Sequence, residues 1–167
     1  MVYSTHLANR VIACFDIKHG RVTKACKFQD NIDISSPIEL ASRLYQEGID
    51  ELIFYDILAS AENRQIDIKI VREVAACVFV PFTVGGGIKT IDDMFLVLDA
   101  GAEKISIDSM AVRNPQIITE GANAFGQQCM VLSMQVKRVP KSDTIPSGFE
   151  IAIDGARVYT GMDAVEW

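Results

Sequence analysis

The sequence predicts an α/β fold with a parallel sheet, and three observations support this. Short apolar runs rich in β-branched and aromatic residues alternate with amphipathic stretches. The runs are apolar throughout, which indicates strands buried on both faces. Gly48, Gly101 and Gly126 each end a helical stretch two or three residues before the next run. Repeated strand–helix–strand units are right-handed, and such short loops suit a barrel as well as an open doubly wound sheet.

Five strands and four intervening helices are expected. Residues 36–39 (SPIE) offer an N-cap serine, a proline at the first helical position and a capping-box glutamate. Residues 90–93 (TIDD) repeat the capping box, and Asn114-Pro115 opens another helix. The fourth helix is predicted from the helical spacing of apolar residues over 65–77. The strands are predicted at 10–16, 51–57, 79–84, 104–107 and 129–136.

The pattern changes after the fifth strand. Residues 148–160 alternate in polarity, and Asp154-Gly155 predicts a two-residue hairpin turn. Residues 160–167 (TGMDAVEW) resemble the first turn of another helix. We therefore expect one truncated domain over 1–167. Residues 1–126 would form its N-terminal half, and residues 127–167 a fifth strand, a hairpin and the start of the next helix.

Composition limits the function classes. The chain has 167 residues, of which 49% are apolar and 23% charged, as in ordinary globular proteins. A net charge of −6 argues against nucleic-acid binding, and no apolar run reaches the roughly 18 residues of a membrane span. Four cysteines without CxxC spacing are interpreted as reduced core residues of a cytoplasmic protein. Two histidines do not favour a metal site, and none is expected.

Polar residues at the ends of predicted strands are the candidates for chemistry. Acids and bases of α/β enzymes lie at the carboxyl ends of parallel strands, so Asp16 is the strongest catalytic candidate. Lys24 would bind an anion or tune the pKa of Asp16. Gln135 ends the fifth strand in the corresponding place, but an amide cannot take a proton. Asp16 could instead only close a turn; Asp56 is a weaker candidate, and His19 is expected to be a solvated loop residue.

The segment after the third strand is a candidate anion site. Gly86 and Gly87 belong to a run of three glycines that lets backbone N–H groups approach an anion. The hydroxyls of Ser106 and Ser109, at the end of the fourth strand, could complete a phosphate cradle, whereas Asp108 would repel phosphate unless a cation or proton intervenes. A tight turn and a helix cap would explain the same residues without a ligand.

Three charged residues begin strands at the opposite end of the sheet. They are Arg10, Glu51 and Lys104. Separate surface charges need no explanation, but in a barrel the three would converge around the bottom opening.

Together, these segments resemble the cyclase subunit of imidazole glycerol phosphate synthase, from histidine biosynthesis. The sister phosphoribosyl isomerase of the same pathway shares the architecture but fits the first strand less well. The match runs nearly end to end. It is carried by RVIACFDIKHGRVTK (10–24), GIDELIFYDI (48–57), PFTVGGGIKT (81–90), AEKISIDSMAVRNP (102–115), KRV (137–139) and TGMDAVEW (160–167).

The resemblance implies part of a (βα)₈ TIM barrel of about 250 residues, a lyase without a cofactor. It implies that ammonia from a glutaminase partner is used to form imidazole glycerol phosphate and an aminoimidazole carboxamide ribotide. Asp16 matches the catalytic acid and Lys24 the assisting lysine, while Gly87 and Ser109 match part of a phosphate site. The residues at the strand starts match a charged ring through which ammonia enters.

Two substitutions and one missing part depart from the family pattern. Gln135 stands where the family has its second catalytic aspartate, and losing a proton acceptor costs roughly 10²–10⁴-fold in rate. Asp108 stands where the family has an asparagine that helps to hold the substrate. Strands six to eight, with a second phosphate site and the last of the charged ring, are not in the chain.

Three functions are therefore considered. The first is a cyclase-family lyase with little or no turnover as given. The second is a non-catalytic half-barrel that binds phosphate or a ribose phosphate and self-assembles, because a five-stranded sheet that cannot close leaves two unpaired edges. The third is a sugar-phosphate isomerase of the sister type.

Overall fold

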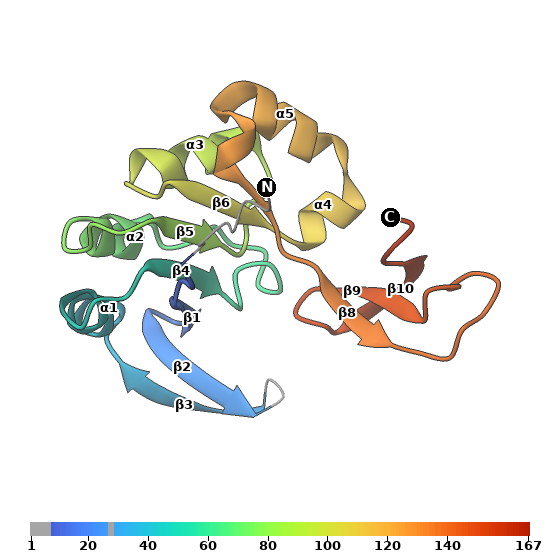
Figure 1. The fold of residues 1–167 in the computed structure, drawn as a ribbon, viewed down its shortest axis with the longest axis horizontal. Helices are drawn as coiled ribbons and strands as arrows, with labels where there is room; N and C mark the ends of the chain where they lie inside the picture. The colour runs from blue at the N-terminus through green and yellow to red at the C-terminus, as the bar shows by residue number, and fades with distance from the viewer. Residues whose placement is uncertain (1–7, 27–28) are drawn as a thin grey trace, which may run out of the picture.

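The fold consists of a large curved sheet flanked by helices and a small separate sheet (Figure 1). The computed structural model describes residues 8–26 and 29–167. The large sheet has the strand order β3-β2-β1-β4-β5-β6-β7. Its strands are β1 (Ile12–Lys18), β2 (Arg21–Cys26), β3 (Gln29–Ser35), β4 (Glu51–Asp56), β5 (Phe82–Gly85), β6 (Lys104–Ile107) and β7 (Met130–Leu132).

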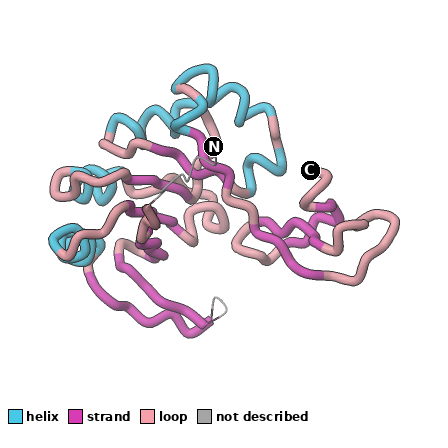
Figure 2. The backbone as a smooth tube through the Cα atoms, in the orientation of Figure 1, coloured by secondary structure: helices cyan, strands magenta, loops and turns pink. Residues whose placement is uncertain are grey.

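The predicted parallel sheet is confirmed, and the barrel is not closed. Strands β1, β4, β5, β6 and β7 pair in parallel, each with the next. The helices lie along the outer side of this sheet (Figure 2). They are α1 (Pro37–Gln46), α2 (Ile68–Ala75), α3 (Ile91–Asp99), α4 (Ser109–Arg113) and α5 (Gln116–Phe125), followed by the 3₁₀ turn Gln127–Cys129.

The core lies between the sheet and the helices. Side chains of the parallel strands that face the helices are almost fully buried, including Leu52, Phe54 and Ile105. The opposite face is open at β1, where Ile12 is 43% exposed and Cys14 is exposed too. The interpretation of Cys14 as a core residue was therefore wrong. On the neighbouring strands the same face is covered, since Glu51 and Thr83 are buried. In a closed barrel this inner face would be filled by side chains from all strands.

The helix signals have different outcomes. The capping box at 90–93 is confirmed, since Thr90 Oγ1 accepts from the Asp93 N–H at 3.1 Å and Asp93 Oδ2 accepts from the Thr90 N–H at 3.0 Å. Ser36 occupies the N-cap of α1, but its side chain makes no capping hydrogen bond. Within the described residues, no helix combines the length and the apolar character needed to cross a membrane.

The predicted fifth strand is corrected by the structure. It divides at Ser133, whose N–H donates to the Ile107 carbonyl at 2.9 Å as the last bond along β6. The chain then leaves the large sheet, and Gln135 starts a strand of the small sheet instead of ending one of the large sheet. The small sheet has the order β10-β9-β8 and consists of β8 (Gln135–Arg138), β9 (Phe149–Ile153) and β10 (Val158–Asp163).

The predicted hairpin is present, but its turn is longer than expected. Four residues, 154–157, connect β9 to β10, because Asp154, Gly155 and Ala156 all adopt positive φ angles before the pairing of Val158 with Ile153. The predicted helix start at 160–167 was also wrong in part. Residues up to Asp163 belong to β10, and only 164–166 form a turn.

Candidate functional site

A cavity of about 200 Å³ opens at the carboxyl ends of the parallel strands. The sheet topology explains its position, because parallel strands bring their carboxyl ends to one edge. Tyr55 and Ser133 also line it and were not predicted, since nothing in their local sequence marks them as cavity residues. Ser106, one of the two hydroxyls expected beside the glycine turn, lines it as well. The other predicted candidates that line the cavity are Asp16, Asp56, Gly86, Gly87, Asp108, Ser109 and Gln135.

Asp108 and Gln135 are in direct contact. Asp108 occupies the N-cap position of α4, but its side chain makes no capping bond and instead accepts a hydrogen bond from Gln135 Nε2. Burial raises the pKa of Asp108 to about 6, against the lowering effect of the Gln135 hydrogen bond. Gln135 Oε1 is buried and has no hydrogen-bond partner among the described residues.

Asp16 reaches the cavity from β1, but Lys24 does not. Asp16 is half-buried, and burial raises its pKa above the ordinary value. Lys24 lies exposed on β2, next to Thr23, which is the residue paired with Asp16. Successive side chains of a strand point to opposite faces, so the structure does not bring Lys24 to Asp16.

The glycine turn approaches neighbouring backbone very closely. Gly86 has a φ of 97°, and a Cβ there would lie 2.3 Å from the Asp56 carbonyl oxygen. The Gly87 N–H donates to Ser60 Oγ at 3.3 Å. The turn is thus fixed by contacts that only glycine permits.

Ser109 Oγ accepts a hydrogen bond of 2.9 Å from the Asp154 N–H, which leaves its own hydroxyl proton free to donate.

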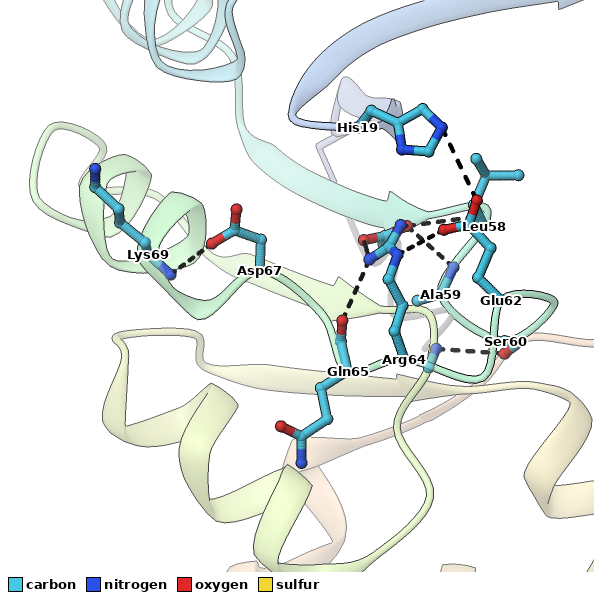
Figure 3. A network of polar contacts seen from close by, with 11 residues as sticks. His19, Leu58, Ala59, Ser60, Glu62, Arg64, Gln65, Asp67 and Lys69 are labelled. Carbon is cyan, nitrogen blue, oxygen red and sulfur yellow. Dashed lines mark hydrogen bonds and ion pairs between the residues drawn. The ribbon is translucent and has the colours of Figure 1, made fainter.

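Asp56, the weaker catalytic candidate, is held in an ion pair. Arg64 donates to both of its carboxylate oxygens, at 2.6 and 2.8 Å, and the Ala59 N–H adds a third bond at 3.1 Å (Figure 3). His19 is exposed, and its Nε2 lies 3.9 Å from Glu62 Oε1. Because the Asp56 carboxylate is occupied by these donors, its arrangement is structural.

The opposite end of the sheet brings three predicted charges together. Glu51 Oε1 accepts from Lys104 Nζ at 2.8 Å, and Glu51 Oε2 accepts from an Arg10 guanidinium nitrogen at 3.2 Å. Glu51 is only 4% exposed. Within residues 8–26 and 29–167, no group of three or more His, Cys, Asp or Glu side chains is arranged to hold a metal ion.

Comparison with known proteins identifies the family of the chain. The family model described as "Histidine biosynthesis protein" matches residues 10–167. The imidazole glycerol phosphate synthase subunits HisF of Desulfatibacillum aliphaticivorans and Nitratidesulfovibrio vulgaris are each 56% identical to the chain over 161 residues. The subunit of Syntrophobacter fumaroxidans is 53% identical over the same length. Each alignment covers 96% of this chain and 62% of the relative, so the chain spans less than two thirds of these proteins. The chain belongs to the histidine biosynthesis protein family.

Proposed function

We propose that this chain supplies the first strands of a cyclase subunit of imidazole glycerol phosphate synthase. The reaction would be the ammonia-dependent formation of imidazole glycerol phosphate and an aminoimidazole carboxamide ribotide, in the cytoplasm. The observation that carries the proposal is the cavity itself, where Asp16 of β1 meets the glycine turn and Ser109. The relatives that share more than half of its residues carry this enzyme's name.

In this function, the cavity binds the ribose-phosphate substrate. Asp16, with a pKa raised by burial, would be the acid. Gly86, Gly87 and Ser109 would face a phosphate group, and Lys24 would assist only if β2 or the substrate moved. At the other end, Arg10, Glu51 and Lys104 would lie where a glutaminase partner delivers ammonia.

Turnover by these 167 residues alone is expected to be little or none. The inner face of the sheet is open to water at Ile12 and Cys14, so the substrate would not be enclosed. Gln135 lines the cavity but cannot take a proton.

The test is an ammonia-dependent cyclase assay with and without a separate chain containing the remaining strands of the Desulfatibacillum relative. We expect turnover only with the added chain, and no turnover for Gln135→Asp alone. Asp16→Asn should abolish the complemented activity, whereas Asp99→Asn, on the outer helix α3, should not. Turnover by the unaltered chain alone would contradict the proposal, and isomerase turnover without ammonia would favour the sister family.

A second candidate function is a phosphate-binding half-barrel that pairs with another copy. The part of the inner face exposed at β1 supports it, because an apolar surface left open at a sheet favours association. Ile12→Glu should then dissociate the pair, while Phe95→Glu, at an apolar site 57% exposed on α3, should leave it intact. A stable monomer of the unaltered chain in sedimentation experiments at micromolar concentration would argue strongly against this candidate.

A further inference from the structure

The cavity is rich in carboxylates and poor in cations. Asp16, Asp56 and Asp108 line it, and none of the described residues lining it is a lysine or arginine. Arg64 neutralises Asp56 from behind the glycine turn. An anionic ligand therefore meets two carboxyl groups, Asp16 and Asp108, that have no ion-pair partner in the described part of the chain. One of them must take up a proton before the anion binds well.

Asp108 is placed to take that proton. Three other groups face it: Asp154, on the turn after β9, raises its pKa, while Gln135 and Arg113 of α4 lower it. Arg113 is itself bound to Asp154 at 2.5 Å, so it is shared between the two carboxylates. Asp16 faces the same cavity from β1. Burial outweighs the other influences, and the pKa of Asp108 reaches about 6.

The Gln135 amide can form a hydrogen bond with Asp108 whether the Asp108 carboxyl is ionised or protonated. Its Nε2 donates to the ionised carboxylate, and its buried Oε1 is without a partner among the described residues. Once the carboxyl is protonated, it becomes a donor, and rotation of the amide by half a turn presents Oε1 as the acceptor. A carboxylate at position 135 would instead compete with Asp108 for the same proton.

We propose that Asp108 takes up a proton from solvent when an anionic ligand enters the cavity, and that Gln135 positions the Asp108 carboxyl. The proton returns to solvent when the ligand leaves, no covalent bond other than the O–H bond forms or breaks, and the Gln135 amide rotates to follow the change. The inference rests on the proposed function in that the ligand is a phosphate ester. It assigns the second proton-binding group of the cavity to Asp108, since the amide at position 135 cannot serve.

The first test uses sulfate, which remains a dianion over the pH range of about 5 to about 8, so only protein groups titrate. Calorimetry in buffers of different ionisation enthalpy should show uptake of nearly one proton per sulfate at neutral pH. The dissociation constant should rise by up to about tenfold per pH unit above the Asp108 pKa. Asp108→Asn should bind more tightly at high pH and lose this dependence. Asp99→Asn, which removes a carboxylate from α3, should behave as the unaltered chain.

The second test measures Asp108 without a ligand, by carbon NMR of its carboxyl group as a function of pH. Gln135→Met keeps the length of the side chain but removes the N–H that stabilises the ionised form, so the pKa of Asp108 should rise. A role of Gln135 in packing alone would leave this pKa unchanged, and that result would overturn its positioning role. The NMR titration of the unaltered chain also identifies Asp108 as the proton-binding residue if Asp108→Asn fails to fold.

The outcomes separate this inference from the proposed function. If the unaltered chain binds no sulfate near pH 5, the anion site is wrong, and this inference falls with it. If sulfate binds but its pH dependence is the same in Asp108→Asn, only the Asp108–Gln135 assignment is overturned.

Discussion

Each end of the parallel sheet holds a buried or half-buried carboxylate, Glu51 at the amino end and Asp108 at the carboxyl end. The charge of the first is compensated by cations, and within residues 8–26 and 29–167 that of the second is not. At the amino end, Glu51 has Lys104 Nζ at 2.8 Å and an Arg10 nitrogen at 3.2 Å. At the carboxyl end, Asp108 has only the Gln135 amide as a hydrogen-bond donor among the described residues. Its nearest cation, Arg113, is engaged by Asp154.

This difference separates a structural charge from one available for chemistry. A carboxylate whose two oxygens are each bound by a cation, as in Glu51, is fixed in place by those ion pairs. A carboxylate whose charge is left uncompensated destabilises the fold but can titrate near neutral pH, which is typical of functional sites. The carboxyl end therefore has the properties of a site, and the amino end those of a fixed charged ring.

The largest loss of stability is expected from a substitution in the glycine turn at the carboxyl end, where the backbone of Gly86 lies very close to that of Asp56. Gly86→Ala places a Cβ 2.3 Å from the Asp56 carbonyl oxygen at a φ of 97°. The strain and the clash together should cost about 3 kcal/mol of unfolding free energy. Gly48→Ala is the matched control, because its φ is 89° and nothing lies within 4 Å of the new Cβ. It should cost about 1 kcal/mol in urea unfolding. Equal losses would mean that the turn can move aside.

A smaller loss is expected when the amino end is deprived of one cation. Lys104→Met leaves Glu51 buried with Arg10 alone, and Arg10 is largely exposed. Unfolding free energy should fall by about 2 kcal/mol, less than for a fully buried pair because Lys104 is partly exposed. In the double variant Glu51→Gln, Lys104→Met, part of the loss should be recovered. A larger loss in the double variant would show that the Glu51 charge is not what makes Lys104 necessary.

The sequence predicted the parallel strands better than the edges of the sheet. Buried strands leave a continuous apolar run, as in β4 and β6, and a cap such as Thr90 marks where a helix begins. The antiparallel hairpin of β2 and β3 was missed. Ile32 and Ile34 of β3 are 70% and 51% exposed, so this edge strand has no apolar run to recognise. β3 pairs with β2, which in turn pairs with β1, and the local sequence reveals neither pairing.

The same limit applies to the candidate site. Strand ends placed Asp16 and Asp108 at one edge, because parallel topology alone determines this. The contact between Asp108 and Gln135 could not be predicted, since it requires the chain to leave β7 at Ser133 and pair Gln135 with Ala152. An apolar run through residues 129–136 suggested one uninterrupted strand.

The uncompensated charge of Asp108 at the carboxyl end predicts that the stability of the fold depends on pH. The pKa of Asp108 is raised from 3.8 to about 6, so the unfolded chain releases this proton first as pH rises. As the pH rises from 3.8 to about 6, the free energy of unfolding therefore decreases. Asp108→Asn removes that loss and should be more stable at neutral pH by about 1–2 kcal/mol, after allowance for solvent screening. Denaturant unfolding of the unaltered chain and of Asp108→Asn, at low and at neutral pH, measures the difference in unfolding free energy. This difference should vanish below pH 3.8. A constant difference across the range would assign the effect to packing.

The smallest change in unfolding free energy is expected from replacing Thr83, a buried polar residue between the two ends of the sheet. Thr83 Oγ1, on β5, is buried and has no hydrogen-bond partner among the described residues. Thr83 lies beside Lys104 in the sheet register, yet it takes no part in the ion pairs of Glu51. Replacing it by valine keeps the shape and removes an unsatisfied group, so unfolding free energy should increase by about 1 kcal/mol or less. A loss of stability instead would show that the hydroxyl belongs to the polar network of the amino end. Thr90→Val provides the contrast, because the Thr90 hydroxyl caps α3 and its removal should cost about 1 kcal/mol.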